Sequence, residues 1–334
     1  GNLRIRPVAP SQELHMKKNH EKATPGYYST AFTNGIKTEL TATHAMAVER
    51  YKFPRSISAA LWVDFASTFE DVATCQYKRV SDTCIEGYVQ AKNVCGHGRY
   101  KLYFSLNTDQ PFQLEEQKET TACLTFGKKV RAVEVRIGLS ALSSELASWE
   151  CARWEKMDFA ELKSQTGNQW EKQLSAIDVK GGKKDDKVIF YTSLYRAYLS
   201  PADVSSPDGA YLGTDGKVYI SEDFRYYSNW SLWDTFRTKF PLLVLTEPAR
   251  MRDMATSLIH LYATGKKDWS TGFESTPTVR TEHAVILLLD AYRKGITTLD
   301  FRKGYAGMKE EMERLPMRSP DQKMESAYDL WAMA

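Results

Sequence analysis

The chain has 334 residues, of which 42% are hydrophobic and 26% charged, and its formal net charge is +3. This length is enough for two domains, and the composition is that of an ordinary globular protein. The small net charge is spread along the chain, which argues against a nucleic-acid-binding surface. No apolar stretch approaches the roughly 20 residues needed to cross a bilayer, so no membrane span is predicted.

The N-terminal residues contain no apolar segment of the kind that makes a signal peptide. The spacing of the five cysteines includes neither a C-x-x-C pair nor a nearby pair of histidines. A zinc site is therefore not expected. One or two disulfides are possible, and the odd count leaves at least one cysteine outside any intramolecular pair. The cysteines are Cys75, Cys84, Cys95, Cys123 and Cys151.

The first half of the chain is rich in runs that predict β-strands. These runs alternate between apolar and polar residues or contain many β-branched residues, and turn sequences such as 107–111 and 127–129 separate them. Strands at this spacing indicate an antiparallel β-sandwich rather than a parallel sheet. The predicted strands are Ser56–Phe65, Cys84–Val89, Arg99–Leu106, Ala122–Phe126 and Val130–Leu139.

The pattern changes near residue 140, where hydrophobic residues begin to recur at the three- and four-residue steps of helices. We predict a β-sandwich domain at 1–142, a helical connector at 143–175 and a helical domain at 176–334. Carbohydrate-active enzymes combine such domains, although a fold alone does not give a function. The helical segments are Ser143–Leu174, Val188–Leu199, Trp230–Leu245, Pro248–Tyr262, Glu282–Lys294, Gly304–Arg314 and Lys323–Ala334.

Aromatic residues crowd around a predicted helix that carries Trp233 and Asp234. An aromatic ring can stack on the C–H face of a sugar while a carboxylate accepts protons from its hydroxyls. Asp234 could equally pair with Arg237 or Arg225 and hold two helices together. Two further aromatic side chains of this segment are expected to be core residues, namely Phe236 and Phe240.

A second candidate is the loop Trp269–Pro277, because loops on a rigid scaffold often carry function. Glycosidic cleavage needs an acid that stays protonated near neutral pH, and burial beside aromatic rings raises the pKa of a glutamate. Glu274, next to Phe273, meets this requirement, although a loop glutamate can equally be a solvated surface residue. His283, in the first turn of the next predicted helix, could bond a substrate hydroxyl or cap a neighbouring loop.

Several short motifs follow one another in order over nearly the whole chain. They are Glu21–Tyr28, Glu39–Thr43, Arg50–Pro54, Ile137–Ser140, Phe190–Tyr195, Asp208–Tyr211, Tyr226–Arg237, Ala291–Ile296 and Glu325–Asp329. Together they resemble the exo-α-mannosidases of glycoside hydrolase family 92. Two positions depart from the family pattern, since Phe273 replaces a usual asparagine and Leu330 a frequent second aspartate.

The resemblance implies an N-terminal antiparallel β-sandwich followed by an (α/α)6 barrel, of which this chain carries the first half. It implies a calcium-dependent glycoside hydrolase that removes terminal α-linked mannose with inversion. Glu274 matches the family's general acid, whereas the general base and most calcium ligands are expected outside this chain. The residues expected to line the sugar subsite are Trp233, Asp234, Arg237, Trp269 and His283.

The expected partner is a mannose-containing glycan or mannoside, with a second chain completing the barrel, and the expected location is secreted or periplasmic. One alternative is a non-catalytic or truncated homologue that binds mannose or a partner protein. Another is a polysaccharide lyase that uses Tyr227, His283 and Arg280 as base and charge neutraliser.

Overall fold

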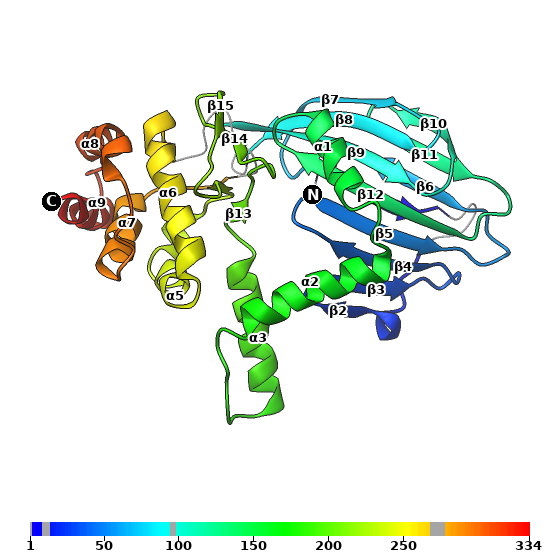
Figure 1. Cartoon of the computed structure of the whole chain (residues 1–334), viewed down its shortest axis with the longest axis horizontal. Coiled ribbons are helices and arrows are strands. Elements are labelled where there is room, and N and C mark those ends of the chain that lie inside the picture. The colour runs from blue at the N-terminus through cyan, green and yellow to red at the C-terminus, as the bar shows by residue number, and fades with distance from the viewer. Residues whose placement is uncertain (1, 9–13, 94–97, 268–277) are drawn as a thin grey trace. The chain divides into compact units, whose positions relative to one another are not determined.

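The computed structural model describes residues 2–8, 14–93, 98–267 and 278–334. Contacts between residues divide the chain into two compact units (Figure 1). The first unit holds Gly1–Ala91 and Leu102–Ala176, and the second holds Lys92–Lys101 and Ile177–Ala334. The predicted domain limits, 1–142, 143–175 and 176–334, stay predictions.

Two antiparallel sheets build the first unit. The smaller sheet has four strands in the order β1-β6-β11-β10, and the larger has eight in the order β2-β3-β4-β5-β12-β9-β8-β7. The strands are β1 Arg4–Pro7, β2 Lys22–Thr24, β3 Tyr27–Ala31, β4 Lys37–Ala42, β5 Met46–Lys52, β6 Ala60–Asp64, β7 Val72–Arg79, β8 Cys84–Lys92, β9 Arg99–Thr108, β10 Phe112–Lys118, β11 Thr121–Phe126 and β12 Ala132–Ser140. A short 3-10 helix, Lys18–His20, precedes β2.

One hydrophobic cluster joins the inner faces of the two sheets. Leu61 on β6 and Leu124 on β11 contribute from the smaller sheet, and Phe104 on β9 and Val135 on β12 contribute from the larger one. All four side chains are fully buried. Alternate residues of each strand point to the same face, so this two-sided burial is that of a sandwich. The predicted antiparallel β-sandwich is confirmed.

The five predicted strands correspond to β6, β8, β9, β11 and β12. The other strands were not predicted individually, and several of them, such as β2, β7 and β10, bury few of their residues. In β7, for example, every residue except Cys75 and Tyr77 is exposed. Such a strand lies at the edge of its sheet, where one side has no neighbour and polar residues are tolerated.

Two helices, α1 Ser144–Arg153 and α2 Phe159–Leu174, cover the other face of the larger sheet (Figure 1). They belong to the predicted helical segment Ser143–Leu174, which is interrupted because Asp158 starts α2 with a capping box shared with Glu161. Helix α1 lies very close to β12, where a Cβ at Gly138 would come within 1.9 Å of the carbonyl oxygen of Ala147. Glycine therefore permits this contact.

The second unit is mainly helical. Its helices are α3 Lys184–Tyr198, α4 Leu232–Thr235, α5 Lys239–Thr246, α6 Pro248–Thr264, α7 Ala284–Arg293, α8 Tyr305–Glu313 and α9 Pro320–Met333, with a 3-10 helix at Phe301–Lys303. Two small sheets precede α4, one from β13 Ala202–Asp203 and β16 Tyr227–Ser228, the other from β14 Ala210–Leu212 and β15 Val218–Ile220. Helices α5 to α9 pack on one another and bury the apolar faces of α6 and α7.

The predicted helix Trp230–Leu245 is wrong as a single element, because the structure divides it into α4 and α5. The carbonyl of Trp230 accepts the N–H of Val279, and the N–H of Leu232 donates to the carbonyl of Arg280. These backbone groups are therefore not available to start a helix at Trp230. As predicted, Phe236 and Phe240 are buried.

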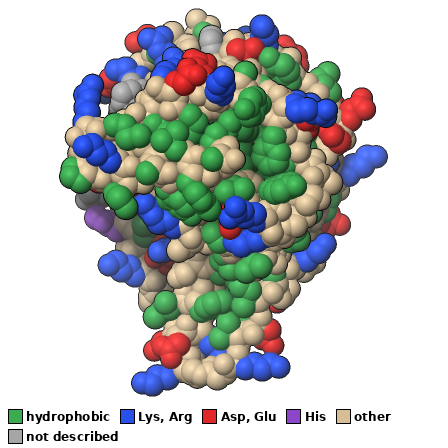
Figure 2. Space-filling model, turned by 90° about the vertical axis from the view of Figure 1, so that its left-hand side faces the viewer, with side chains coloured by type: hydrophobic (Ala, Val, Ile, Leu, Met, Phe, Trp, Pro, Cys, Tyr) green, Lys and Arg blue, Asp and Glu red, His purple; other side chains and the backbone are tan. Residues whose placement is uncertain are grey.

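Hydrophobic side chains gather between charged ones on the side where α8 and α9 lie (Figure 2). Exposed large hydrophobic residues of these helices include Tyr305, Met324, Tyr328, Leu330 and Trp331. A second chain that completes the barrel remains a prediction. Within the described ranges no helix is both long and apolar enough to span a membrane, and Cys75, Cys84, Cys123 and Cys151 are free thiols.

Candidate functional site

Two segments distant in sequence meet in the second unit. Residues 230–232 run beside residues 279–280, joined by hydrogen bonds of 2.9 Å from Val279 N to Trp230 O and from Leu232 N to Arg280 O. Ser231 and Arg280 form a parallel bridge at this point. The pairing brings Trp233, which follows one segment, close to His283, which follows the other.

A pocket of about 420 Å³ opens at this meeting point. Its walls combine aromatic, cationic and acidic side chains, and helix α9 supplies five of the twelve lining residues. The lining residues are Trp233, Arg280, Glu282, His283, Glu311, Leu315, Pro316, Asp321, Gln322, Glu325, Ser326 and Asp329. Two predicted subsite residues, Trp233 and His283, are therefore brought together here.

His283 occupies the N-cap of α7 rather than its first turn, which begins at Ala284. Its backbone is in the left-handed region, with φ 67° and ψ 20°, a conformation uncommon for residues other than glycine. The side chain is 5% exposed, and its Nδ1 lies 3.0 Å from Oδ2 of Asp329. Strained backbone that persists in a buried position is typical of functional sites.

A network of charges surrounds the Trp233 ring. The guanidinium of Arg280 lies 5.1 Å from the ring centre, and Arg280 Nε donates to Glu282 Oε1 at 2.6 Å. Trp233 Nε1 donates to Glu325 Oε2 at 3.5 Å, and Arg237 pairs with Glu325 Oε1 at 3.3 Å. The carboxylates of this wall are thereby held in fixed directions by cations and an indole N–H.

Asp234 is placed differently from Trp233 and His283. Its side chain is exposed and accepts a hydrogen bond of 2.8 Å from Ser231 Oγ. Neither of the two partners considered from the sequence is paired with it, because Arg237 contacts Glu325 and Arg225 contacts Asp203. Neither Asp234 nor Arg237 is among the residues that line the pocket.

Glu274 and Trp269, the predicted acid and one of the predicted subsite residues, lie outside the described residues. Their roles stay predictions. The described segment that follows them starts at Thr278, whose buried N–H donates to Asn93 Oδ1 at 3.2 Å. In the sequence, Glu274 is thus followed closely by Arg280, Glu282 and His283, which line the pocket.

Three residues of the pocket wall carry buried polar atoms without a hydrogen-bond partner in the described part of the chain. Among the buried side-chain atoms of the described residues, His283 Nε2, Asp329 Oδ1 and Glu282 Oε2 have no such partner. Leaving a buried polar group unpaired costs about 1–3 kcal/mol, so proteins rarely retain it without a reason. A ligand rich in hydroxyl groups could supply the missing donors and acceptors.

The same residues are a poor match for the calcium that the family resemblance implies. Calcium takes about six to eight oxygen ligands, several of them carboxylate. In the described ranges no group of three or more His, Cys, Asp or Glu side chains could hold a metal ion. Moreover, Glu282, Glu325 and Asp329 each face a cation or an imidazole. The described residues alone do not fit a calcium site.

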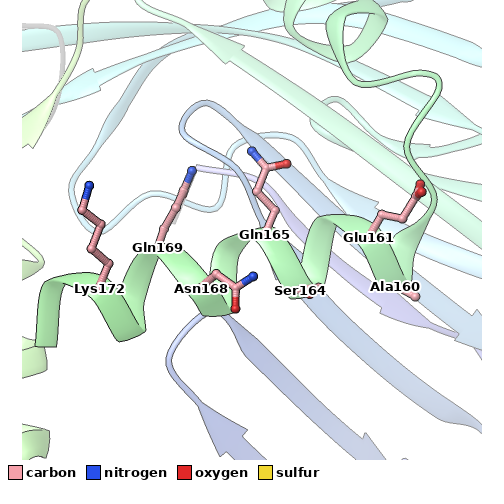
Figure 3. A pocket seen from close by; sticks show the side chains of 7 residues that line it. All are labelled: Ala160, Glu161, Ser164, Gln165, Asn168, Gln169 and Lys172. Carbon is pink, nitrogen blue, oxygen red and sulfur yellow. The ribbon is translucent and has the colours of Figure 1, made fainter. Parts of the chain in front are cut away.

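Another hollow lies on helix α2 in the first unit and shows that size alone does not identify a site (Figure 3). Its volume is about 720 Å³, but all of its lining residues come from that one helix. They are Ala160, Glu161, Ser164, Gln165, Asn168, Gln169 and Lys172. The open surface of a single helix does not surround a ligand as a binding pocket does.

The lyase alternative requires Tyr227 near His283 and Arg280. Tyr227 is 5% exposed, and its hydroxyl accepts a hydrogen bond of 3.4 Å from Arg250 Nε. It does not line the pocket that contains the other two residues. The structure therefore gives this alternative no support.

Two wall residues, Glu325 and Asp329, received no role from the sequence, although they delimit one of the family motifs. They are four positions apart on α9, so their side chains lie on the same face of the helix. That spacing was a usable signal. Which partner this face meets depends on the packing of α9 against α7, and the sequence does not reveal it.

Two models of known protein-family domains match this chain. The model of the glycosyl hydrolase family 92 N-terminal domain matches residues 4–140, and that of the family 92 catalytic domain matches residues 146–332. A curated relative, an uncharacterized secreted glycosidase of Arthroderma benhamiae, is 22% identical over 67% of this chain and 33% of its own length.

Solved structures agree in fold. The family GH92 α-mannosidase BT3965 from Bacteroides thetaiotaomicron is 22% identical, with a TM-score of 0.85, and the match covers 100% of this chain and 53% of that one. The family GH92 inverting mannosidase BT2199 from the same organism is 24% identical, with a TM-score of 0.78 over 96% of this chain and 46% of that one. The chain thus spans about half the length of these relatives. With both family domains matched in order, the chain belongs to glycosyl hydrolase family 92.

Proposed function

We propose that this chain takes part in the hydrolysis of terminal α-linked mannose from glycans or mannosides, with inversion at the anomeric carbon. Membership of a glycoside hydrolase family and the names of two structural relatives, both mannosidases, support this choice. The single observation that carries it is the pocket walled by Trp233, Arg280, His283 and carboxylates, because it combines an aromatic face with several hydrogen-bonding groups.

In this proposal Glu274 is the general acid that protonates the oxygen of the leaving group. A second carboxylate, outside this chain, activates a water on the opposite face of the sugar. Inverting enzymes keep the two carboxyl groups about 6.5–9.5 Å apart to leave room for that water. Trp233 and Trp269 would stack on the sugar ring, while His283 and the pocket carboxylates would bind its hydroxyls.

Three further parts of the proposal rest on the resemblance or on relatives. Calcium dependence rests on the family resemblance alone, and no step above uses the metal. A secreted or periplasmic location is supported by the relative that is named a secreted glycosidase. A binding partner that completes the barrel is compatible with a chain that spans about half the length of its structural relatives.

Replacement of Glu274 by glutamine tests the proposal. We expect the rate on a mannoside with a poor leaving group to fall by about 100-fold or more, because general-acid catalysis contributes that much. An aryl mannoside with a good leaving group needs little protonation and should be affected less. Glu313→Gln, on the exposed side of α8, is the matched control and should keep the wild-type rate.

Full activity of Glu274→Gln on the poor leaving group would exclude Glu274 as the acid. If the wild-type chain hydrolyses neither substrate, calorimetric titration with mannose separates the two remaining readings. Binding without hydrolysis would support the non-catalytic, mannose-binding homologue. Absence of both would remove mannose as the ligand of this chain.

A further inference from the structure

We propose that Asp329 is a positioning residue that fixes the imidazole of His283, so that His283 Nε2 is the hydrogen-bond acceptor offered to a substrate hydroxyl. The proposal deepens the function proposed above and rests on it for the identity of the hydroxyl-bearing ligand. Its structural part depends only on residues of α7, α9 and the pocket between them.

The carboxylate determines which imidazole nitrogen carries the proton. Asp329 Oδ2 lies 3.0 Å from His283 Nδ1, and both side chains are 5% exposed. An ionised carboxylate has no proton to donate, so Nδ1 must be the donor of this bond, a tautomer inferred from the partner's chemistry. In the neutral imidazole, Nε2 then carries a lone pair and can only accept.

The ring is held on other sides as well. His283 is the N-cap of α7 in a left-handed conformation, and its carbonyl accepts the N–H of Leu287 at 3.3 Å. The Phe236 ring packs against the imidazole with 4.7 Å between ring centres. With the backbone and one ring face fixed, the bond to Asp329 leaves the imidazole a single orientation.

The residue that carries this free nitrogen is part of the pocket wall. His283 lines the pocket, and its Nε2 is one of the buried atoms without a hydrogen-bond partner among the described residues. The nearest carboxylate oxygen, Glu325 Oε2, lies 3.9 Å away, which is too far for a hydrogen bond. Glu325 is itself engaged by Trp233 Nε1 and Arg237.

In this tautomer His283 Nε2 and Glu325 Oε2 are two acceptors that lie 3.9 Å apart. Glu325 cannot donate to Nε2, so the hydrogen-bond donor for His283 has to come from the ligand or from water. The hydroxyl of a sugar is a donor of the right kind, and it would pair with Nε2 only while Asp329 keeps the proton on Nδ1. A carboxamide at position 329 could donate to Nδ1 instead and leave the proton on Nε2, which would turn the acceptor into a donor.

The test compares the wild-type chain with Asp329→Asn by ¹⁵N NMR of the histidine side chains, at a pH where the imidazoles are neutral. We expect the wild-type His283 to show the Nδ1–H tautomer and the variant to show the Nε2–H tautomer. Asp290→Asn is the matched control. Asp290 is a carboxylate of α7 that pairs with Lys294, with 2.6 Å between the two charged groups, and it does not line the pocket. It should keep the wild-type spectrum.

Binding of methyl α-mannoside provides the functional readout. We expect Asp329→Asn to weaken binding by about tenfold or more, the effect of losing one buried hydrogen bond, and Asp290→Asn to leave it unchanged. An unchanged tautomer in Asp329→Asn would overturn the proposal. So would an Nε2–H tautomer in the wild type, a result that does not depend on whether the variant folds. If the wild type bound no mannoside, the proposed function would fail, while the spectra would still decide the role of Asp329.

Discussion

The interior of the β-sandwich and the pocket of the helical unit use their buried residues in opposite ways. In the sandwich, Phe65, Phe104, Leu106 and Val135 are fully buried and surrounded by other apolar side chains. In the pocket, by contrast, a buried histidine with a left-handed backbone lies beside carboxylates, and several polar atoms have no partner among the described residues.

The difference indicates which region is shaped for stability and which for binding. Apolar burial contributes to the free energy of folding in proportion to the area removed from water. Unpaired polar atoms and strained backbone reduce that free energy, and strained backbone clusters at functional sites. Substitutions in the sandwich should therefore alter unfolding, and substitutions in the pocket should alter binding.

The largest expected effect is on the sandwich side of this comparison. Phe104→Ala removes a fully buried ring that stacks on Phe65 at 5.5 Å between centres. We expect the free energy of unfolding to fall by about 3–5 kcal/mol, because the ring's transfer energy is lost and a cavity remains. Chemical denaturation followed by tryptophan fluorescence measures this change.

Phe69→Ala is the control for that experiment, since the side chain of Phe69 is 85% exposed. Its free energy of unfolding should stay within about 0.5 kcal/mol of wild type. A loss below 1 kcal/mol for Phe104→Ala would contradict a tightly packed sandwich core.

The sequence predicted the parts of the fold that depend on local pattern. Strands such as β12 were predicted because Val133, Val135 and Ile137 alternate with polar residues. Helix α6 was predicted to start at Pro248, where proline suits the first turn, and it does. Edge strands such as β7 gave no such pattern, since the sheet neither buries them fully nor requires apolar residues there.

The site was predictable only in part, for a related reason. Trp233 and His283 could be named because of their chemistry and the motifs around them, and the structure brings both to one pocket. The pairing of residues 230–232 with 279–280, which interrupts the predicted helix at Trp230, is a long-range contact that no local pattern encodes. The partners of His283 on α9 were missed for the same reason, because they are some 40 positions away in sequence.

An intermediate effect is expected from Glu49, a carboxyl group that interrupts the apolar sandwich. It lies on β5 between Ala47 and Tyr51, whose side chains belong to the sandwich core, and it accepts a hydrogen bond from the Tyr51 hydroxyl. Burial raises the pKa of Glu49 from 4.5 to about 7, while the bond from Tyr51 opposes that rise. Glu49 therefore makes the free energy of unfolding depend on pH.

The sign follows from proton binding. Between pH 4.5 and about 7 the folded state holds this proton more tightly than the unfolded state, so wild-type stability falls as pH rises through that window. Glu49→Gln is neutral throughout, and its stability relative to wild type should rise by as much as about 3 kcal/mol across the same window. Urea denaturation at pH 4.5 and pH 8 measures the difference, and a constant difference would show that Glu49 is solvated.

The smallest effect on stability is expected at the pocket. The pair between Arg237 and Glu325 is partly solvated, with side-chain exposures of 53% and 28%. Such pairs contribute about 0–1 kcal/mol, so Arg237→Ala should change the free energy of unfolding by less than about 1 kcal/mol. Because Arg237 helps to hold Glu325 at the pocket wall, the same variant should nevertheless bind methyl α-mannoside more weakly.

Arg302→Ala, which removes an exposed partner of Asp300, is the control and should change neither the free energy of unfolding nor the binding of methyl α-mannoside. If Arg237→Ala lowered the free energy of unfolding by more than 2 kcal/mol, the pocket wall would stabilise the helical unit much as the apolar core stabilises the sandwich. The contrast between the two regions would then no longer hold.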